Sequence, residues 1–333
     1  MAAITTPILA ETPHLRPLNI VRDLPAVADL VESCFADTMD AEGRRYIQQM
    51  RRAGSDNAFL RWANTAVETA SMPLSGFIWA ENGNIVGNVS LIPFRREGRK
   101  YYLVANVAVR PEYRRRGIAR ALTVAAMRQA RQKRADETWL HVRDDNPGAV
   151  ELYRSLGFVE QARRTSWQAK PDRNACPDGF GLTFSRHGGR DWPRQESWLR
   201  RLYPDLLAWY HPVPWTTLRP GFGPALYRFF LETEIRNWAV RSGDQLAGVL
   251  TWQPTFGGSD RLWAAVPPEG SALVLTALLL QARRALAWRQ MLTLDFPAGE
   301  YRSAVEAAGF HPHRTLIWMR AAETAAADIR TST

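Results

Sequence analysis

Cysteine is scarce in this chain of 333 residues. The two cysteines, Cys34 and Cys176, are far apart in the sequence and belong to no Cys-x-x-Cys or Cys/His cluster. Their scarcity argues against a disulfide framework and against a zinc site built on thiolates, and it fits a reducing compartment. We therefore expect a cytoplasmic protein without a metal centre.

Long apolar runs are also missing. The longest candidate, Ser271–Leu280, is followed by Gln281 and Arg283 and falls well short of the roughly 20 residues that span a bilayer. The segment Met1–Thr12 has no basic stretch followed by an apolar core, so we expect neither an export signal nor a membrane partner. Hydrophobic residues still make up 46% of the chain, which is typical of a globular protein and argues against a disordered one.

Lysine contributes little to the net charge of +10, because only Lys100, Lys133 and Lys170 are present and the other cations are arginines. A basic excess fits a nucleic acid, an anionic membrane surface or a small polyanionic ligand. A preference for arginine over lysine also reflects the base composition of the genome. We therefore expect no nucleic-acid partner.

The first half of the chain predicts a β-hairpin followed by alternating strands and helices. The dipeptide Asn82-Gly83 between two apolar runs is a strong hairpin signal. An early helix is expected to be capped by Asp23, with Pro25 in its first turn. The pattern indicates a mixed α/β fold with helices on both faces of the sheet. Strands are expected at 14–20, 76–81, 85–94, 100–109, 138–142 and 159–168, and helices at 23–39, 41–53, 117–134 and 146–156.

The second half repeats this order, which indicates duplication of one domain. Three segment pairs support the repeat: Asn84–Val89 with Gln245–Leu250, Val109–Glu112 with Val266–Glu269, and Leu156–Phe158 with Ala308–Phe310. The turn-rich stretch 172–179 is the expected boundary, so we predict domains at 1–172 and 180–322. Strands are expected at 183–186, 238–241, 245–252, 261–266, 291–296 and 314–319, and helices at 192–210, 271–289 and 299–308.

The most specific motif joins a β-branched strand to a basic loop and a long helix. The amides at a helix N-terminus are unpaired, and the helix dipole favours negative charge there. Gly117 and Ala119 would let a phosphate approach these amides, and Arg114, Arg115 and Arg116 add forked donors. The pattern favours a pyrophosphate ligand, and the alternative is a solvated basic turn before a surface helix.

This segment resembles the Gcn5-related N-acetyltransferase (GNAT) family. The family's pyrophosphate signature, Q/R-x-x-G-x-G/A, is matched by Arg114-Arg115-Arg116-Gly117-Ile118-Ala119. The resemblance implies acetyl-CoA as co-substrate, with the backbone of Val107-Ala108-Val109 along its pantetheine arm. It covers residues 14–170 with specific motifs and 180–320 only by element order and the Gly-Phe ending.

A second motif of the same resemblance runs from Asp144 to Phe158. Asn146 is expected to cap a helix that starts with Pro147, and the resemblance gives Asn146 a contact with the coenzyme or the substrate. It assigns Tyr153 the catalytic role of protonating the leaving thiolate. The alternative for Tyr153 is a packed helical tyrosine with no chemistry.

The general base is not assigned by the sequence. Some relatives carry a glutamate on the strand before the phosphate loop, but Tyr101–Asn106 contains no carboxylate. The alternatives for this base are a water chain that leads to a backbone carbonyl, or a carboxylate from elsewhere, either Glu81 or Asp37. His141 is another candidate, against the alternative of a strand histidine with a structural role. Neither cysteine is placed for a covalent step, so direct attack by the amine is expected.

The second half has lost both motifs. Its loop, Val266–Ala272, is shorter and has no arginine cluster, and counting back from the shared Gly-Phe places Val305 opposite Tyr153 and Ala298 opposite Asn146. We therefore predict a catalytic domain at 1–172 and a degenerate, non-catalytic domain at 180–322.

These predictions favour an N-acetyltransferase that moves an acetyl group from acetyl-CoA to a primary amine on a small molecule or a peptide. Two alternatives stay open. One is a GNAT-like protein that binds or senses acyl-CoA without turnover, and the other is an enzyme resembling mycothiol synthase. The sequence identifies neither the acceptor nor the acyl-chain preference, and it leaves open whether the protein is a monomer or a homodimer.

Overall fold

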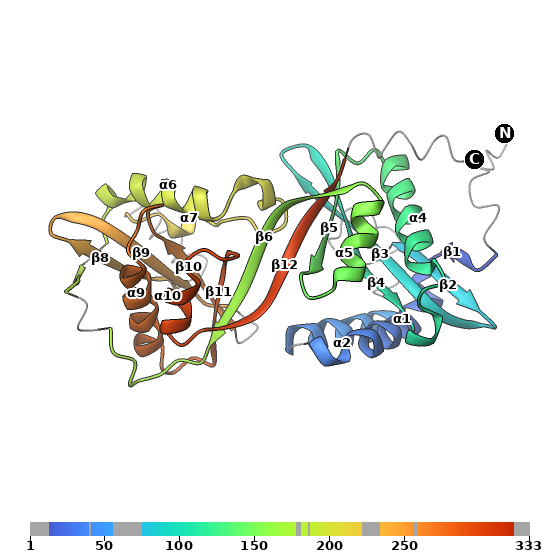
Figure 1. The fold of residues 1–333 in the computed structure, drawn as a ribbon, viewed down its shortest axis with the longest axis horizontal. Helices are drawn as coiled ribbons and strands as arrows, with labels where there is room; N and C mark the ends of the chain where they lie inside the picture. The colour runs from blue at the N-terminus through green and yellow to red at the C-terminus, as the bar shows by residue number, and fades with distance from the viewer. Residues whose placement is uncertain are drawn as a thin grey trace. The chain divides into compact units, whose positions relative to one another are not determined.

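The computed structural model describes residues 13–39, 41–55, 75–177, 181–185, 187–221, 234–255 and 259–322 (Figure 1). These residues fold into two compact units. The first comprises residues 13–142, 146–161 and 318–322, and the second comprises 143–145 and 162–317, with the gaps just given. Apart from the short stretch 143–145, the chain enters the second unit through one strand and returns to the first through its last strand.

The first unit has helices on both faces of a mixed sheet. Ile78 packs with α1 and α2, whereas Trp79, on the opposite face of the same strand, lies with Gly87 against α4. The strand order is β1-β2-β3-β4-β5, followed by the end of β12 (His311–Ala321) and the start of β6 (Phe158–Ala169). The elements are α1 (Ile20–Phe35), α2 (Ala41–Ser55), α4 (Ile118–Gln132), α5 (Pro147–Ser155), β1 (Leu15–Pro17), β2 (Gly76–Glu81), β3 (Asn84–Arg96), β4 (Arg99–Val109) and β5 (Glu137–Arg143).

The predicted hairpin turn is confirmed. Asn82 and Gly83 both have positive φ, at 50° and 78°, and join β2 to β3 as an antiparallel pair. Positive φ at both central residues is the conformation that fits the right-handed twist of a two-residue hairpin. β3 pairs antiparallel with β4, and β4 pairs parallel with β5.

The start of α1 differs from the prediction. Asn19, not Asp23, is the N-cap, and its side chain accepts a hydrogen bond from the Arg22 amide. Asp23 lies one turn further on, 2% exposed, and accepts hydrogen bonds from the Asn19 amide and the Arg16 guanidinium. Pro25 consequently falls inside the helix. The prediction was wrong because the ion pair with Arg16, from the preceding strand, draws Asp23 into the helix.

The second unit repeats the same scaffold. Its strand order runs from the start of β12 through β6-β11-β10-β9-β8-β7. One core cluster joins its helices and strands, with Trp252, Phe296 and Phe310 fully buried. The elements are α6 (Trp192–Leu202), α7 (Trp215–Leu218), α9 (Ala272–Ala285), α10 (Arg302–Ala307), β7 (Thr183–Ser185), β8 (Arg236–Ser242), β9 (Gln245–Gln253), β10 (Ser259–Ala265) and β11 (Met291–Pro297).

The helix predicted for residues 192–210 is shorter than expected. α6 ends at Leu202, and Pro204 precedes a separate 3-10 turn at Asp205–Leu207. The residue before a proline is disfavoured in the helical region, so the apolar pattern of this segment continues without the helix.

Two strands, β6 (Phe158–Ala169) and β12 (His311–Ala321), belong to both units. In the second unit β6 pairs antiparallel with β11, and Arg164 from β6 donates to Asp295 at 2.8 Å and to the Leu202 carbonyl at 2.8 Å. In the first unit Trp318 from β12 packs on His141, with ring centroids 4.9 Å apart. Each repeat thus has a strand that also contributes residues to the other unit. The boundary expected at 172–179 follows β6, and its last two residues lie outside the described residues.

We expect Trp318→Ala to destabilise the chain by about 3–5 kcal/mol, because Trp318 is 2% exposed and its removal leaves a cavity in the first unit. Trp288→Ala is the control, since Trp288 is 55% exposed, and it should cost less than about 1.5 kcal/mol. Urea unfolding followed by circular dichroism measures both. Equal losses for the two variants would contradict the assignment of Trp318 to the core.

Asp23 makes the stability depend on pH in the acid range. Burial alone raises the pKa of Asp23, but hydrogen bonds from Arg16, the Asn19 amide and Arg22 outweigh it and lower that pKa to about 2. Because the pKa is lower in the folded state than in the unfolded one, the stabilisation is complete above about pH 4 and is lost as the pH falls toward 2. Asp23→Asn should therefore cost about 2–3 kcal/mol at pH 7. Unfolding curves at several pH values should show this difference shrinking between pH 4 and 2.

Candidate functional site

The site starts where β4 leaves β5. The parallel pairing of these strands runs from Tyr101↔Glu137 to Val104↔Leu140, whereas β4 continues to Val109. Residues 101–104 are buried, but residues 105–107 are half-buried. Among the described residues, this part of β4 therefore offers an edge without a partner strand on the β5 side, where an extended ligand can lie along the backbone.

A β-bulge marks this point of β4. Asn88 is in register with Ala108 and Ser90 with Ala105, so two residues of β4, Asn106 and Val107, face one residue of β3. Asn106 has a φ of 50°, and its side chain donates to the Tyr46 hydroxyl at 2.8 Å and to Ser90 at 3.2 Å. These bonds tie the bulge to α2. Asn88 secures it from β3 by donating to the Asn106 carbonyl at 3.0 Å.

The phosphate loop follows directly. Pro111–Tyr113 forms a 3-10 turn, and Gly117 is the N-cap of α4 with a φ of 79° and no side-chain cap. A cavity of about 220 Å³ lies here, lined by Val109, the loop, the first residues of α4 and Leu152 of α5. The first amides of a helix that lacks a capping side chain are donors for an anion. The loop, the helix start and α5 therefore meet at a site suited to a phosphate.

The three arginines of the loop have different surroundings. Arg114 donates through Nε to the Val109 carbonyl at 3.2 Å and lines the cavity. Arg116 is bound by both carboxylate oxygens of Glu81, at 2.9 and 3.1 Å, and lies over the Tyr113 ring. Arg115 is exposed, lines the cavity and forms no hydrogen bond or ion pair with a described residue. Arg114 and Arg115 are thus the arginines best placed for a ligand, while Arg116 anchors the loop to β2.

Glu81 is accordingly a poor candidate for a base. The Trp79 indole donates to it at 2.9 Å, and this bond, with the ion pair to Arg116, keeps the pKa of Glu81 below its ordinary value. Asp37 is exposed in the 3-10 turn after α1. The structure brings neither carboxylate among the residues that line the loop cavity.

Helix α5 carries the second motif. Asn146 is its N-cap, as predicted, and its side chain accepts from the Ala149 amide at 3.1 Å. Tyr153, in the last turn of the helix, is 7% exposed and packs edge-on against Phe158, with centroids 6.1 Å apart. Its hydroxyl forms no hydrogen bond with a described residue, and burial raises the pKa of Tyr153 above its ordinary value. The phenol is therefore protonated at neutral pH and has a proton to donate.

His141 packs against Trp318 and is half-buried on β5. Like Asn146 and Tyr153, it is not among the residues that line the loop cavity. Its stacking in the first unit favours the structural alternative for this residue.

The corresponding place in the second unit is closed by its own side chains. Ser271 caps α9 by accepting from the Leu273 amide at 3.2 Å, and the Tyr301 hydroxyl donates toward the carbonyls of Pro267 and Gly270, at 2.9 and 3.2 Å. Thr276 of α9 also donates to the Ala304 carbonyl of α10 at 3.1 Å. Here the helix start is capped and the two helices are bonded together, so less room and fewer donors are left for an anion.

Several residues of the site carry no sequence signal. Tyr46, Ser90 and Asn88 hold the bulge, yet Tyr46 is 60 residues from its partner Asn106. Arg120 donates to Ser155 at 2.7 Å and joins the start of α4 to the end of α5, 35 residues apart. Polar residues of these types are common on surfaces, so only the folded chain identifies them.

No cluster of three or more histidine, cysteine, aspartate or glutamate side chains able to hold a metal ion occurs within the described ranges. In the same part of the chain, no helix combines the length and the apolar character needed to cross a bilayer.

Gly117 should be required for its backbone conformation, not for space. A Cβ at this position meets no atom within 4 Å, but the φ of 79° is unfavourable for other residues. We expect Gly117→Ala to cost about 1–2 kcal/mol in the free energy of unfolding. Gly148→Ala is the matched control, because Gly148 also has no atom within 4 Å yet lies inside α5, where alanine should be neutral or stabilising by up to about 1 kcal/mol. Thermal unfolding of the two variants measures the difference, and equal effects would contradict it.

Comparison with known proteins places this site in a family. Residues 34–158 match the model of the acetyltransferase (GNAT) family. The ribosomal protein bS18-alanine N-acetyltransferase of Escherichia coli is 37% identical over 67 residues, which cover 20% of this chain and 45% of that protein. The mycothiol acetyltransferase of Thermobispora bispora is 32% identical over 164 residues, which cover 47% of this chain and 51% of that protein. The chain thus spans about half the length of these curated relatives.

Solved structures extend the likeness of fold to both units. A GCN5-related N-acetyltransferase from Sphaerobacter thermophilus superposes with a TM-score of 0.54 at 15% identity, covering 93% of this chain and 96% of that one. A GCN5-related glucosamine N-acetyltransferase region of a fungal β-N-acetylglucosaminidase gives 0.53 at 13% identity, covering 92% of this chain and 37% of that one. The predicted mixed α/β fold of two tandem acyltransferase-like units is confirmed. Residues 34–158 are thus similar to the acetyltransferase (GNAT) family, and the fold of the chain is similar to that of solved GCN5-related N-acetyltransferases.

Proposed function

We propose that the protein is an N-acetyltransferase that moves an acetyl group from acetyl-CoA to a primary amine by direct attack. The observation that carries the proposal is the meeting, in the first unit, of an uncapped helix start with an arginine-lined cavity and a strand edge free of β5. This combination suits a ligand with a pyrophosphate at one end and an extended, amide-bearing arm.

In this proposal the pyrophosphate lies at the amides of Gly117, Ile118 and Ala119. Arg114 and Arg115 line the same cavity and supply positive charge. The pantetheine arm runs along β4 at Val107, Ala108 and Val109, where the backbone is no longer paired with β5. Asn146, at the start of α5, is proposed to contact the coenzyme or the acceptor.

The proposed chemistry forms a C–N bond and breaks a C–S bond. The amine nitrogen attacks the thioester carbonyl, and the thiolate of the coenzyme leaves with a proton from the Tyr153 hydroxyl. A phenol kept protonated by burial, and not bonded to a described residue, is suited to this donation. With Glu81 engaged by Arg116, we assign the removal of the amine proton to water at the open edge of β4.

The two domains are proposed to have different roles. Residues 1–172 form the catalytic domain and residues 180–322 a degenerate, non-catalytic one. The capped start of α9 and the bond between α9 and α10 support this division, because both reduce the space and the donors that a coenzyme requires.

The acceptor is proposed to be an amine on a small molecule or a peptide, in a cytoplasmic protein that is a monomer or a homodimer. The relatives' names, which mention an alanine of ribosomal protein bS18 and mycothiol, suggest two acceptors to assay: a peptide with an alanine amine and an amine precursor of mycothiol. The second of these tests the alternative of a mycothiol-synthase-like enzyme.

A second candidate function is the binding of acyl-CoA without turnover. It is favoured by the engagement of Glu81 with Arg116 and by the absence of a carboxylate from Tyr101–Asn106. The two functions share the coenzyme site and differ only in whether the acetyl group is transferred.

Isothermal titration with acetyl-CoA tests the coenzyme site. We expect one coenzyme per chain for the wild type and a loss of at least about 100-fold in affinity for Gly117→Glu, which puts a carboxylate at the helix start. Gly98→Glu is the matched control, because Gly98 has nearly the same φ, 78°, and also no atom within 4 Å, but lies in the β3–β4 turn. No binding by the wild type would sink both candidate functions, and two coenzymes per chain would contradict the assignment of the second domain.

Tyr153→Phe separates catalysis from binding. We expect kcat to fall about 100-fold or more while the affinity for acetyl-CoA and the free energy of unfolding stay nearly unchanged, because the lost hydroxyl bonds to no described residue. Tyr203→Phe, at a second buried tyrosine, should leave kcat unchanged. Turnover is measured by release of the free thiol with each amine acceptor. An unchanged kcat for Tyr153→Phe would remove the proton-donor role.

A further inference from the structure

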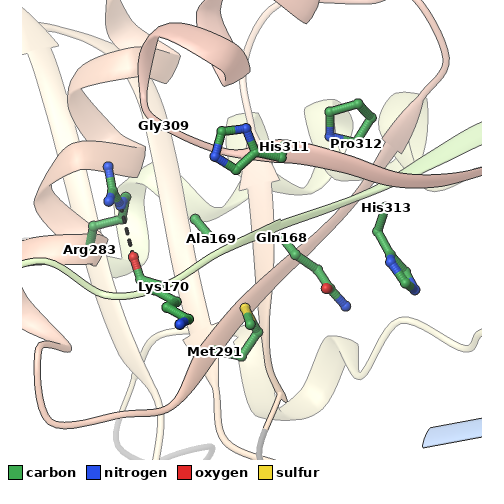
Figure 2. Close-up of a pocket in the computed structure, with 9 residues that line it drawn as sticks. All are labelled: Gln168, Ala169, Lys170, Arg283, Met291, Gly309, His311, Pro312 and His313. Carbon is green, nitrogen blue, oxygen red and sulfur yellow. Dashed lines mark hydrogen bonds between the residues drawn. The ribbon is translucent and has the colours of Figure 1, made fainter. Parts of the chain in front are cut away.

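The second unit contains a larger cavity that the proposed function does not use. It has a volume of about 480 Å³ and lies where the end of β6, the start of β11 and the start of β12 come together (Figure 2). Its lining includes Lys170, Arg283 and His311, together with Ala169, Met291 and Pro312. Gln168, Gly309 and His313 complete the lining, which thus combines cationic, polar and apolar side chains and contains no aspartate or glutamate.

Arg283 is committed to the structure of the cavity. It donates to the Lys170 carbonyl at 3.1 Å and to the Ala308 carbonyl at 2.9 Å, and its guanidinium lies 3.7 Å from Asp172. Gly309 has a φ of 76°, which favours glycine, and a Cβ there would come within 2.3 Å of the guanidinium and displace it. The bond to the Lys170 carbonyl, drawn in Figure 2, fixes the backbone from which the lysine side chain projects.

Lys170 itself is an exposed cation, and its ammonium has no hydrogen bond or ion pair with a described residue. In the first unit, the residue at the corresponding position is a carboxylate that forms ion pairs with the neighbouring cations. There Glu137 begins β5 as Met291 begins β11, and it pairs with Arg99 at 2.8 Å and with Arg320 of β12 at 3.5 Å. In the second unit the last pair of β11 and β6 is Leu292↔Ala169, which brings Lys170 next to Met291, where the carboxylate is replaced by a thioether.

We propose that this cavity binds a small organic anion, with its carboxylate or phosphate group on Lys170 and its carbon skeleton against Ala169, Met291 and Pro312. The anion takes the place of the carboxylate that Glu137 provides in the first unit. His311, at the start of β12, lines the same cavity (Figure 2), and its imidazole supplies a further donor. The proposal does not depend on the proposed acetyl transfer, since every residue in it belongs to the second unit.

Titration with butyrate, butyl phosphate and inorganic phosphate tests the proposal. All variants carry Gly117→Glu, so that the phosphate loop of the first unit does not bind the probes. We expect one butyrate or one butyl phosphate per chain, bound more tightly than inorganic phosphate because of the apolar wall. The better probe identifies the anionic group.

Met291→Glu is the decisive variant. It places beside Lys170 a carboxylate equivalent to that of Glu137 in the first unit. We expect it, and Lys170→Met, to weaken binding about tenfold or more, whereas Met291→Gln, of the same shape without the charge, keeps binding within about twofold. Thermal unfolding confirms that each variant is folded.

Three outcomes would overturn the proposal. One is that none of the probes binds the parent, and another is that Met291→Glu binds as tightly as Met291→Gln. The third is that Zn²⁺ binds tightly and loses its site in His311→Ala while no anion binds, which would make the cavity a metal site.

Discussion

Gly117 turns the chain into α4 with a φ of 79° and leaves the first amides of that helix without a side-chain cap. The remaining features of the site depend on this turn. Gly87 lets Ile118 and Leu122 of α4 approach the sheet, where a Cβ would lie 3.0 Å from both side chains. Arg116 fixes the loop to β2 through Glu81, and Leu152 of α5 closes the cavity from the other side.

The edge of β4 is the second constraint, and it is held by polar contacts, not by core packing. Asn106 adopts a left-handed conformation that suits an asparagine in a bulge, and its side chain bonds to α2 and β3 at once. Because the bulge falls where β5 stops pairing, the same few residues both bend the strand and expose its edge.

The two repeats share one scaffold but differ in the residues at its helix and strand termini. Their strands and helices follow in the same order, yet the helix start is open at Gly117 and capped by Ser271 in the second repeat. At the other edge of the sheet, where β5 and β11 begin, it is the second repeat that has the unpaired charge. Glu137 forms ion pairs with the arginines of the first unit, whereas Met291 offers Lys170 no carboxylate in the second. Each repeat thus has unpaired donors or cations at a place where the other repeat has a cap or an ion pair.

The sequence by itself determined the features that depend on neighbouring residues: the Asn82-Gly83 turn, the cap at Asn146, and the order of strands and helices, including the duplication. Local backbone preferences carry these signals, which is why they can be read without a structure. A prediction from neighbouring residues failed where a partner from another element intervened. Asp23 was predicted to cap α1 but instead forms an ion pair with Arg16. The sequence predicted the loop before α4 and its uncapped helix start from a local motif, but not the separate surroundings of Arg114, Arg115 and Arg116.

Only the tertiary structure decided the contacts between distant segments. The Tyr46–Asn106 bond spans 60 residues, and the Arg164–Asp295 pair and the Thr165–Thr315 contact of β6 span 131 and 150. The sharing of β6 and β12 between the units, and the cavity at Lys170, follow from such contacts. No local pattern encodes them, because the residues that meet are chosen by the packing of whole elements and not by their neighbours in the chain.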